Sequence, residues 1–211
     1  MGYLVDSAKA SHLKVFGVVS IATPVLAFAF IALSIDTYPQ FSWVNNALSD
    51  LGVVFGITAL LFNFGLCASG LLTLILAFGL YRFLNRNVIG KIGALVFGAA
   101  GAALEGIGWA PENYRPFHYI FSVAFFAFIP MALLLVAAYF FSTRQNPLGA
   151  FTLSIAAFAA IPWVLYFIIR YVSGVAIPEM ISALAASTWA IAIGWEMYKA
   201  GTAGSKIGLE P

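Results

Sequence analysis

Six long runs of apolar residues divide this sequence, and each is close to the length that a helix needs to cross a membrane. A transmembrane helix takes about 20 predominantly apolar residues. The runs are continuously apolar, whereas strands of a transmembrane barrel alternate between apolar and polar residues. We therefore predict six transmembrane helices. They are placed near residues 15–33, 58–81, 89–109, 117–141, 147–171 and 177–199.

The composition excludes a soluble protein. Hydrophobic residues make up 63% of the chain and charged residues only 9%, whereas a soluble domain carries about 25% charged residues. The single cysteine, Cys67, lies inside an apolar run, so the sequence contains no disulfide framework. The predicted fold is all-α: a polytopic membrane protein built as a six-transmembrane-helix bundle, with residues 1–211 forming one domain.

The basic residues predict the orientation of the bundle. Cytoplasmic loops of membrane proteins carry an excess of lysine and arginine. If the N-terminus is inside, only Arg115 and Arg170 lie on the outer side. We therefore predict a multi-pass protein of the cell membrane with both termini cytoplasmic. The inner basic residues are Lys9, Lys14, Arg82, Arg86, Lys91, Arg144, Lys199 and Lys206.

The segment between the first two runs, "FSWVNNALSDLGVVFG" at residues 41–56, is partly polar and partly apolar. Its first half is too polar for lipid, and its second half is too apolar to stay in water. We expect an interfacial or re-entrant helix here, or an extension that makes the second helix long and tilted. Trp43 suits the interface, where aromatic rings lie at the depth of the headgroups.

The same topology gathers most polar side chains on the outer side. Five of the eight acidic residues lie there, together with one of the two histidines and both outer arginines. This asymmetry predicts a polar cavity that opens outward. The residues concerned are Asp36, Asp50, Glu105, Glu112, Arg115, His118, Arg170 and Glu179.

Three of these residues are candidates for catalysis. Glu105 lies inside the hydrocarbon margin, where ionisable groups mark functional sites by default, but it could also be a protonated carboxyl or pair with Arg170. His118 could act as an acid beside Glu105 as general base. Glu179 follows Pro178 at a helix start, where the helix dipole alone favours an acid.

A metal centre is not expected. Zinc needs three or four protein ligands, and the outer side holds only one histidine; carboxylates suit a harder cation or proton handling. The sequence identifies no cofactor.

Five further residues are candidates for substrate binding. Ser49 and Asn63 share a face if one helix runs through both. Alternatively, Ser49 or Asp50 caps a helix and Asn63 links helices. Arg170 could hold a phosphate, or reach the headgroups as an arginine at the end of a span. Trp109 closes the run that contains Glu105. The predicted binding residues are Ser49, Asp50, Asn63, Trp109 and Arg170.

Several stretches together resemble a family of small six-helix prokaryotic membrane proteins that is classed as a domain of unknown function. They are "ALSDLG" at 47–52, "LFNFGL" at 61–66, the turn from Glu105 to Trp109 with His118, and "AIPEMI" at 176–181. The resemblance implies a six-span fold and an outward polar cluster, and it implies no activity. The polar positions that it maps onto this chain are Ser49, Gly52, Asn63, His118 and Glu179.

Three classes of function remain open. The first is a protein that binds or processes a lipid or its headgroup; if it is an enzyme, it is a lipid hydrolase or transferase. The second is a transporter of ions or small solutes, although the inner half of the bundle offers little polar lining. The third is a structural or partner-binding membrane protein. We expect membrane lipids, and no nucleic acid, as partners.

Overall fold

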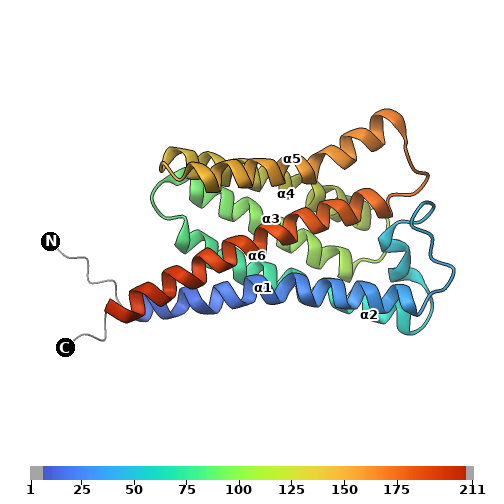
Figure 1. The fold of residues 1–211 in the computed structure, drawn as a ribbon. Helices are drawn as coiled ribbons and strands as arrows, with labels where there is room; N and C mark the ends of the chain where they lie inside the picture. Colours follow the sequence, from blue (N-terminus) through green and yellow to red (C-terminus); the bar gives the residue numbers. More distant parts are fainter. Residues whose placement is uncertain (1–6, 208–211) are drawn as a thin grey trace.

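The fold is that of a computed structural model, which describes residues 7–207 and contains six long α-helices and one short 3-10 helix, η1 (Figure 1). All six α-helices are long and apolar enough to cross a membrane. The predicted all-α, six-helix fold is therefore confirmed, whereas the side of the membrane on which the termini lie stays a prediction. The elements are α1 (Ser7–Asp36), η1 (Leu48–Val53), α2 (Ile57–Phe83), α3 (Val88–Trp109), α4 (Phe117–Ser142), α5 (Asn146–Ile169) and α6 (Ala176–Ile207).

The six helices form a closed ring in sequence order. Each packs against its neighbours in the chain, and α6 returns to pack along α1 (Figure 1). A methyl group added to Gly17 of α1 would lie 2.6 Å from the carbonyl oxygen of Gly194 of α6. The two backbones can approach this closely because small residues line the contact. The start of α1 and the end of α6 therefore lie at one end, which we call the terminus end.

The segment between α1 and α2 does not extend α2. Residues 48–53 form η1, and the chain then turns at Gly56, whose φ of +96° suits glycine. Helix α2 begins only at Ile57. Ser49 and Asn63 therefore lie on two different helices, η1 and α2, and do not share one helical face. Helix η1 lies at the end of the bundle opposite the terminus end, which we call the η1 end (Figure 1).

Proline shapes α5 near the η1 end. Pro162 lies inside the helix, where it removes one backbone hydrogen bond and favours a kink. The second half of α5 tilts away from the rest of the bundle (Figure 1). Room for a cavity is therefore expected beside this half.

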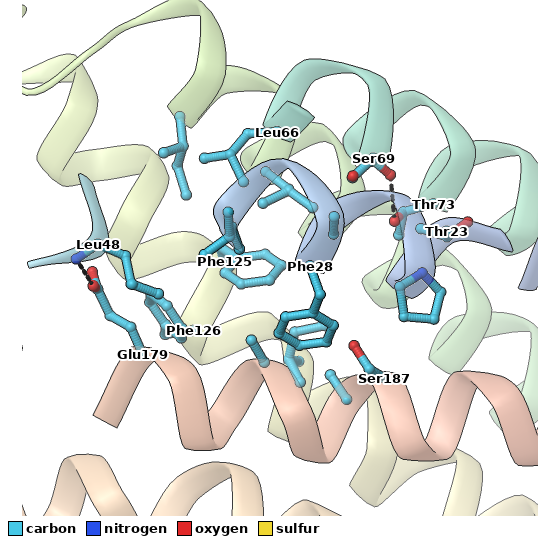
Figure 2. Close-up of a pocket in the computed structure, with 18 of the residues that line it drawn as sticks. Thr23, Phe28, Leu48, Leu66, Ser69, Thr73, Phe125, Phe126, Glu179 and Ser187 are labelled. Carbon is cyan, nitrogen blue, oxygen red and sulfur yellow. Dashed lines mark hydrogen bonds between the residues drawn. The ribbon is translucent and has the colours of Figure 1, made fainter. Parts of the chain in front are cut away.

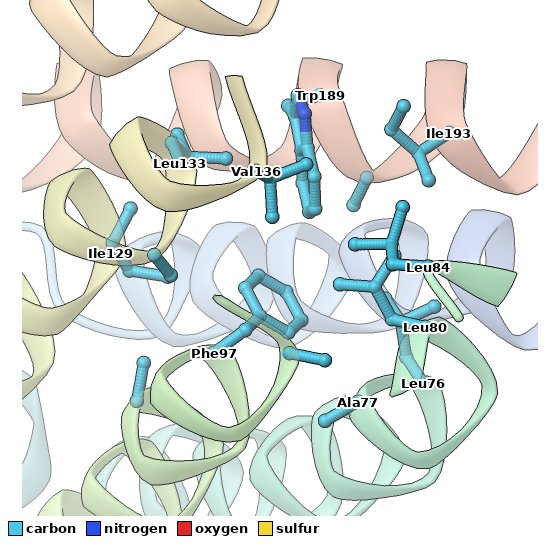
Figure 3. Packing of buried hydrophobic residues seen from close by; sticks show 14 of the residues in the cluster. Leu76, Ala77, Leu80, Leu84, Phe97, Ile129, Leu133, Val136, Trp189 and Ile193 are labelled. Carbon is cyan, nitrogen blue, oxygen red and sulfur yellow. The ribbon is translucent and has the colours of Figure 1, made fainter. Parts of the chain in front are cut away.

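Buried apolar residues form two clusters. The larger one fills the half of the bundle toward the terminus end, where Trp189 of α6 packs against Phe97 of α3 (Figure 3). The smaller one surrounds η1, whose Leu51 is fully buried. The smaller cluster includes Leu48, which contacts one of the polar groups described next.

Candidate functional site

Two loops join at the η1 end and form the base of the site. Three backbone hydrogen bonds connect the segment before η1 with the segment before α6: Gly174 donates to Val44 over 2.7 Å, and Val175 and Ala176 both donate to Asn46, over 3.1 and 2.9 Å. These bonds hold η1 beside the first turn of α6.

Glu179 connects these two helices through its side chain. One carboxylate oxygen, Oε2, accepts a hydrogen bond of 2.6 Å from the backbone N–H of Leu48, the first residue of η1 (Figure 2). The residue is 93% buried, because only 7% of its surface is exposed. No described residue donates a hydrogen bond to the second oxygen, Oε1. Glu179 therefore has a structural contact on one side and a free acceptor on the other.

Asp50 and Glu112 form a pair of acidic side chains beside η1. Asp50 accepts hydrogen bonds from the Asn46 amide and the Ala47 backbone, over 2.6 and 3.0 Å. Glu112 is held by Arg115 over 3.1 Å, and its other oxygen is buried without a partner among the described residues. Burial, and then the neighbouring Asp50 carboxyl, raise the pKa of Glu112, although Arg115 and His118 act in the opposite direction. An added cation would relieve this crowding of negative charge.

His118 is buried, and both of its ring nitrogens have partners. Nδ1 lies 2.8 Å from the carbonyl oxygen of Ala110, and Nε2 lies 3.3 Å from the hydroxyl oxygen of Ser122. Nδ1 is the donor, because a carbonyl oxygen can only accept. Ser122 lies one helical turn after His118 on α4. The pair closes the turn between α3 and α4 and faces the cavity described next.

The outer cavity has a volume of about 800 Å³ and lies between η1, α4, α5 and the start of α6. We call the part of its lining that contains Glu112, Arg115, His118 and Glu179 the polar end, and five aromatic side chains in the remaining lining the aromatic wall. Ligand sites in proteins commonly enclose about 300–1,000 Å³ with few polar groups on apolar walls. The aromatic wall consists of Tyr119, Phe126, Trp163, Tyr166 and Phe167.

An inner cavity of about 120 Å³ continues from the outer one toward the middle of the bundle. The two cavities share Ser49, Ser122, Phe126 and Glu179 as lining residues. Figure 2 shows the inner cavity with Glu179 and Phe126 at one end and Ser69 toward the other. The Ser69 hydroxyl is buried without a hydrogen-bond partner among the described residues.

Glu105 lies apart from this site. It lines neither cavity, and its backbone packs so closely on α2 that a methyl group at Gly70 would lie 2.5 Å from its nitrogen. No described hydrogen bond joins Glu105 to His118, and the described ion pairs do not include one between Glu105 and Arg170. The structure therefore offers no contact for the predicted base–acid pair or for the alternative ion pair.

Of the predicted binding residues, Ser49 lines both cavities, whereas Asp50 lines neither. Asn63 donates to the Gly52 carbonyl oxygen over 2.9 Å and so links α2 to η1, as the alternative reading of this residue expected. Arg170 ends α5 and donates to the Tyr166 hydroxyl over 3.2 Å. Trp109 is 74% exposed and lines neither cavity.

Sequence reasoning missed Ser122 and the aromatic wall. The spacing of four residues from His118 to Ser122 was a usable signal, because residues one turn apart on a helix are neighbours. Trp163 and Phe167 carried no such signal among the many aromatic residues of the chain. Among the described residues, no three histidine, cysteine, aspartate or glutamate side chains come close enough to hold a metal ion.

Comparisons with known proteins give a family but no activity. No curated protein and no solved structure matches the chain. The model of one family, described as "Protein of unknown function (DUF998)", matches residues 21–196 and thus covers α2 to α5 completely, together with about half of α1 and two thirds of α6. On this match, the chain belongs to the DUF998 family of proteins of unknown function.

Proposed function

We propose that this protein binds a lipid-like amphiphile, with the polar head of the ligand at Glu179 and its apolar part along α5. The observation that carries the proposal is the outer cavity, whose lining combines polar side chains, among them the buried His118 and Glu179, with an aromatic wall. A molecule with a polar head and an apolar tail matches both parts of this lining at once.

The aromatic wall is built around Trp163. Its ring lies 4.7 Å from that of Phe126 on α4 and is stacked on Phe167 at 6.2 Å, measured between ring centroids. The centre of the Tyr166 ring lies 6.3 Å from that of Trp163, and the Tyr166 hydroxyl accepts a hydrogen bond from Arg170. Such packed aromatic side chains supply a large apolar surface of fixed shape.

The open side of the cavity supports entry from the membrane. Tyr119 and Phe167 line the cavity and are 69% and 68% exposed. In a bundle of transmembrane helices, this exposed apolar surface faces lipid. With the predicted orientation, the ligand enters from the outer leaflet of the cell membrane.

Transport is the less supported alternative. Leu76 and Phe97 line the inner cavity, and both belong to the large apolar cluster of the other half. A pathway for ions or solutes needs polar groups at several depths. A binding cavity that is closed on one side agrees better with this arrangement.

Catalysis is a second candidate, because the Ser122 hydroxyl lies 3.3 Å from His118 Nε2 within the same cavity. In a hydrolase, a histidine accepts the proton of a serine hydroxyl that attacks an ester. Here a backbone carbonyl orients the ring in place of a carboxylate. Ser122→Ala should abolish release of fatty acid from a lipid ester while leaving lipid binding intact; ester cleavage by the variant at the wild-type rate would exclude this role.

Native mass spectrometry of protein released from a neutral detergent tests the binding proposal. We expect adducts of one amphiphile on the wild-type protein and a loss of at least about tenfold in occupancy for Trp163→Ala, which removes the centre of the aromatic wall. Trp195→Ala is the matched control, because this tryptophan is exposed on α6 far along from the cavity. Equal occupancy in both variants would contradict the proposal.

A further inference from the structure

We propose that the head of the bound amphiphile is a cation of the ammonium class. This inference rests on the proposed function and specifies the chemical class of the ligand's head group. The polar end of the outer cavity presents two carboxyl groups, those of Glu112 and Glu179, and a third, that of Asp50, is a neighbour of Glu112. Arg115 is the one arginine or lysine among the described lining residues.

The carboxyl group of Glu179 has an oxygen that can accept a hydrogen bond from a ligand. Glu179 is 93% buried and uses only Oε2, on the Leu48 N–H. Its other oxygen has no hydrogen bond from a described residue, although the residue lines both cavities. A buried carboxylate with a free oxygen is costly unless a cation or a donor meets it. An ammonium head supplies both.

The existing cation does not fill this role. The Arg115 guanidinium bonds to Glu112, but its side chain is 76% exposed. An ion pair at such an exposed position contributes little. Glu179 has no ion pair with a described residue. The acidic side chains that line the cavity, Glu112 and Glu179, therefore outnumber its basic ones, of which Arg115 is the single described example.

The aromatic wall favours the same ligand. Cations are attracted to the faces of tryptophan and tyrosine rings, and cages of such rings recognise ammonium groups. Trp163 and Tyr166 line the same cavity as the polar residues of the turn between α3 and α4. The Arg170 guanidinium already lies 5.0 Å from the centre of the Tyr166 ring, so the Trp163 ring is the principal one left for a ligand cation. Carboxylates and rings together select against an anionic head.

Three probes with the same alkyl chain and different head charges test the inference. Dodecylamine, dodecanol and dodecanoate are titrated separately into the full-length protein in a neutral detergent, and occupancy is measured by native mass spectrometry. We expect the ammonium probe to bind at least about tenfold more tightly than the alcohol, and the carboxylate probe to bind most weakly. Trp163→Ala should weaken binding of the amine and of the alcohol.

Glu179→Gln should remove the preference for the amine over the alcohol. The glutamine retains an oxygen that can accept from Leu48, so the contact with η1 persists. Glu112→Gln is a second variant in the loop before α4, and it should reduce the preference partly if Glu179→Gln does not fold. Glu196→Gln, in an exposed ion pair at the terminus end, is the matched control.

The outcomes separate the two proposals. Equal binding of amine and alcohol to the wild-type protein, with loss of both in Trp163→Ala, would overturn the cationic head and leave amphiphile binding intact. Tighter binding of the dodecanoate probe would overturn the cationic head as well. Absence of any probe from the wild-type protein would overturn both proposals.

Discussion

Trp189 and Glu179 are both buried on α6, about 15 Å apart along the helix axis at 1.5 Å per residue, yet their surroundings differ. Trp189 is enclosed by apolar side chains from α3 and α4, and its ring nitrogen donates to Thr152 over 3.1 Å (Figure 3). Glu179 lies between two cavities and leaves one oxygen without a described partner. Close apolar packing is thus concentrated toward the terminus end and open volume toward the η1 end.

We infer from this difference that the two halves of the bundle have different roles, one in stability and the other in ligand binding. A membrane helix bundle is held together mainly by close packing, because lipid tails are as apolar as the side chains. A half that is tightly packed can stabilise the ring of helices on its own. The other half can then retain cavities and unpaired acceptors, which a fully packed bundle would not tolerate. The following variants test this division.

The largest loss of stability is expected from Trp189→Ala. The change removes the largest buried side chain of the packed half and leaves a cavity, which should lower the free energy of unfolding by about 3–5 kcal/mol. Unfolding in mixed micelles with increasing denaturing detergent measures this loss. Trp195→Ala on the exposed face of α6 is the control. A similar small effect of both variants would show that the packed half does not carry the stability.

The next largest effect is expected from Gly70→Ala, in the contact between α2 and α3. The added methyl group would lie 2.5 Å from the Glu105 backbone nitrogen. Because backbone atoms cannot move aside without distorting the helix, we expect the variant to destabilise the fold by about 1–3 kcal/mol. In the same contact, Gly98→Ala brings its methyl group 3.3 Å from the Ala77 side chain and should cost much less. Equal thermal stability of Gly70→Ala and wild type would contradict the close approach.

Asn63→Ala tests how firmly η1 is attached. The variant removes the hydrogen bond to the Gly52 carbonyl oxygen, and a lost hydrogen bond costs about 1 kcal/mol. Hydrogen exchange of the η1 amides should become faster, with little change around Trp189. Uniformly faster exchange in both halves would show that they unfold together. If the protein were instead a transporter with Asn63 on its pathway, Asn63→Leu would abolish flux in vesicles.

The smallest effect concerns the pH dependence of stability. Because the folded state raises the pKa of Glu112 above its ordinary value of 4.5, it binds this proton more tightly than the unfolded state does. The contribution is fully present below pH 4.5 and is lost as the pH rises through the raised pKa. Glu112→Gln should therefore gain stability relative to wild type as the pH rises from 4.5 toward neutrality.

Thermal melts of both proteins across this pH range measure the difference. The groups that act on Glu112 are Asp50, Arg115 and His118. Glu196→Gln at the terminus end is the control. A constant difference between Glu112→Gln and wild type at every pH would contradict this role of the carboxyl.

The fold was largely predictable, because six long apolar runs leave few alternatives. The candidate site was predictable only in part. His118 and Glu179 could be placed near one another because both follow from the topology, and Ser49 joined them in the same cavity. Glu105 was misleading as a partner of His118, because topology gives the depth of a residue in the bundle and not the neighbour that it faces.

By itself, the sequence determined the class of the protein, the number of its helices and the end at which its acidic residues gather, because these follow from hydropathy and from the alternating direction of successive spans. Only the tertiary structure decided which acids meet and where space remains. Packing of α4 against α5 set the aromatic wall, the turn at Gly56 separated η1 from α2, and the hydrogen bond from Leu48 brought η1 to Glu179. Such contacts depend on helix rotation and on close approach, and neither is encoded in the hydropathy of any single helix.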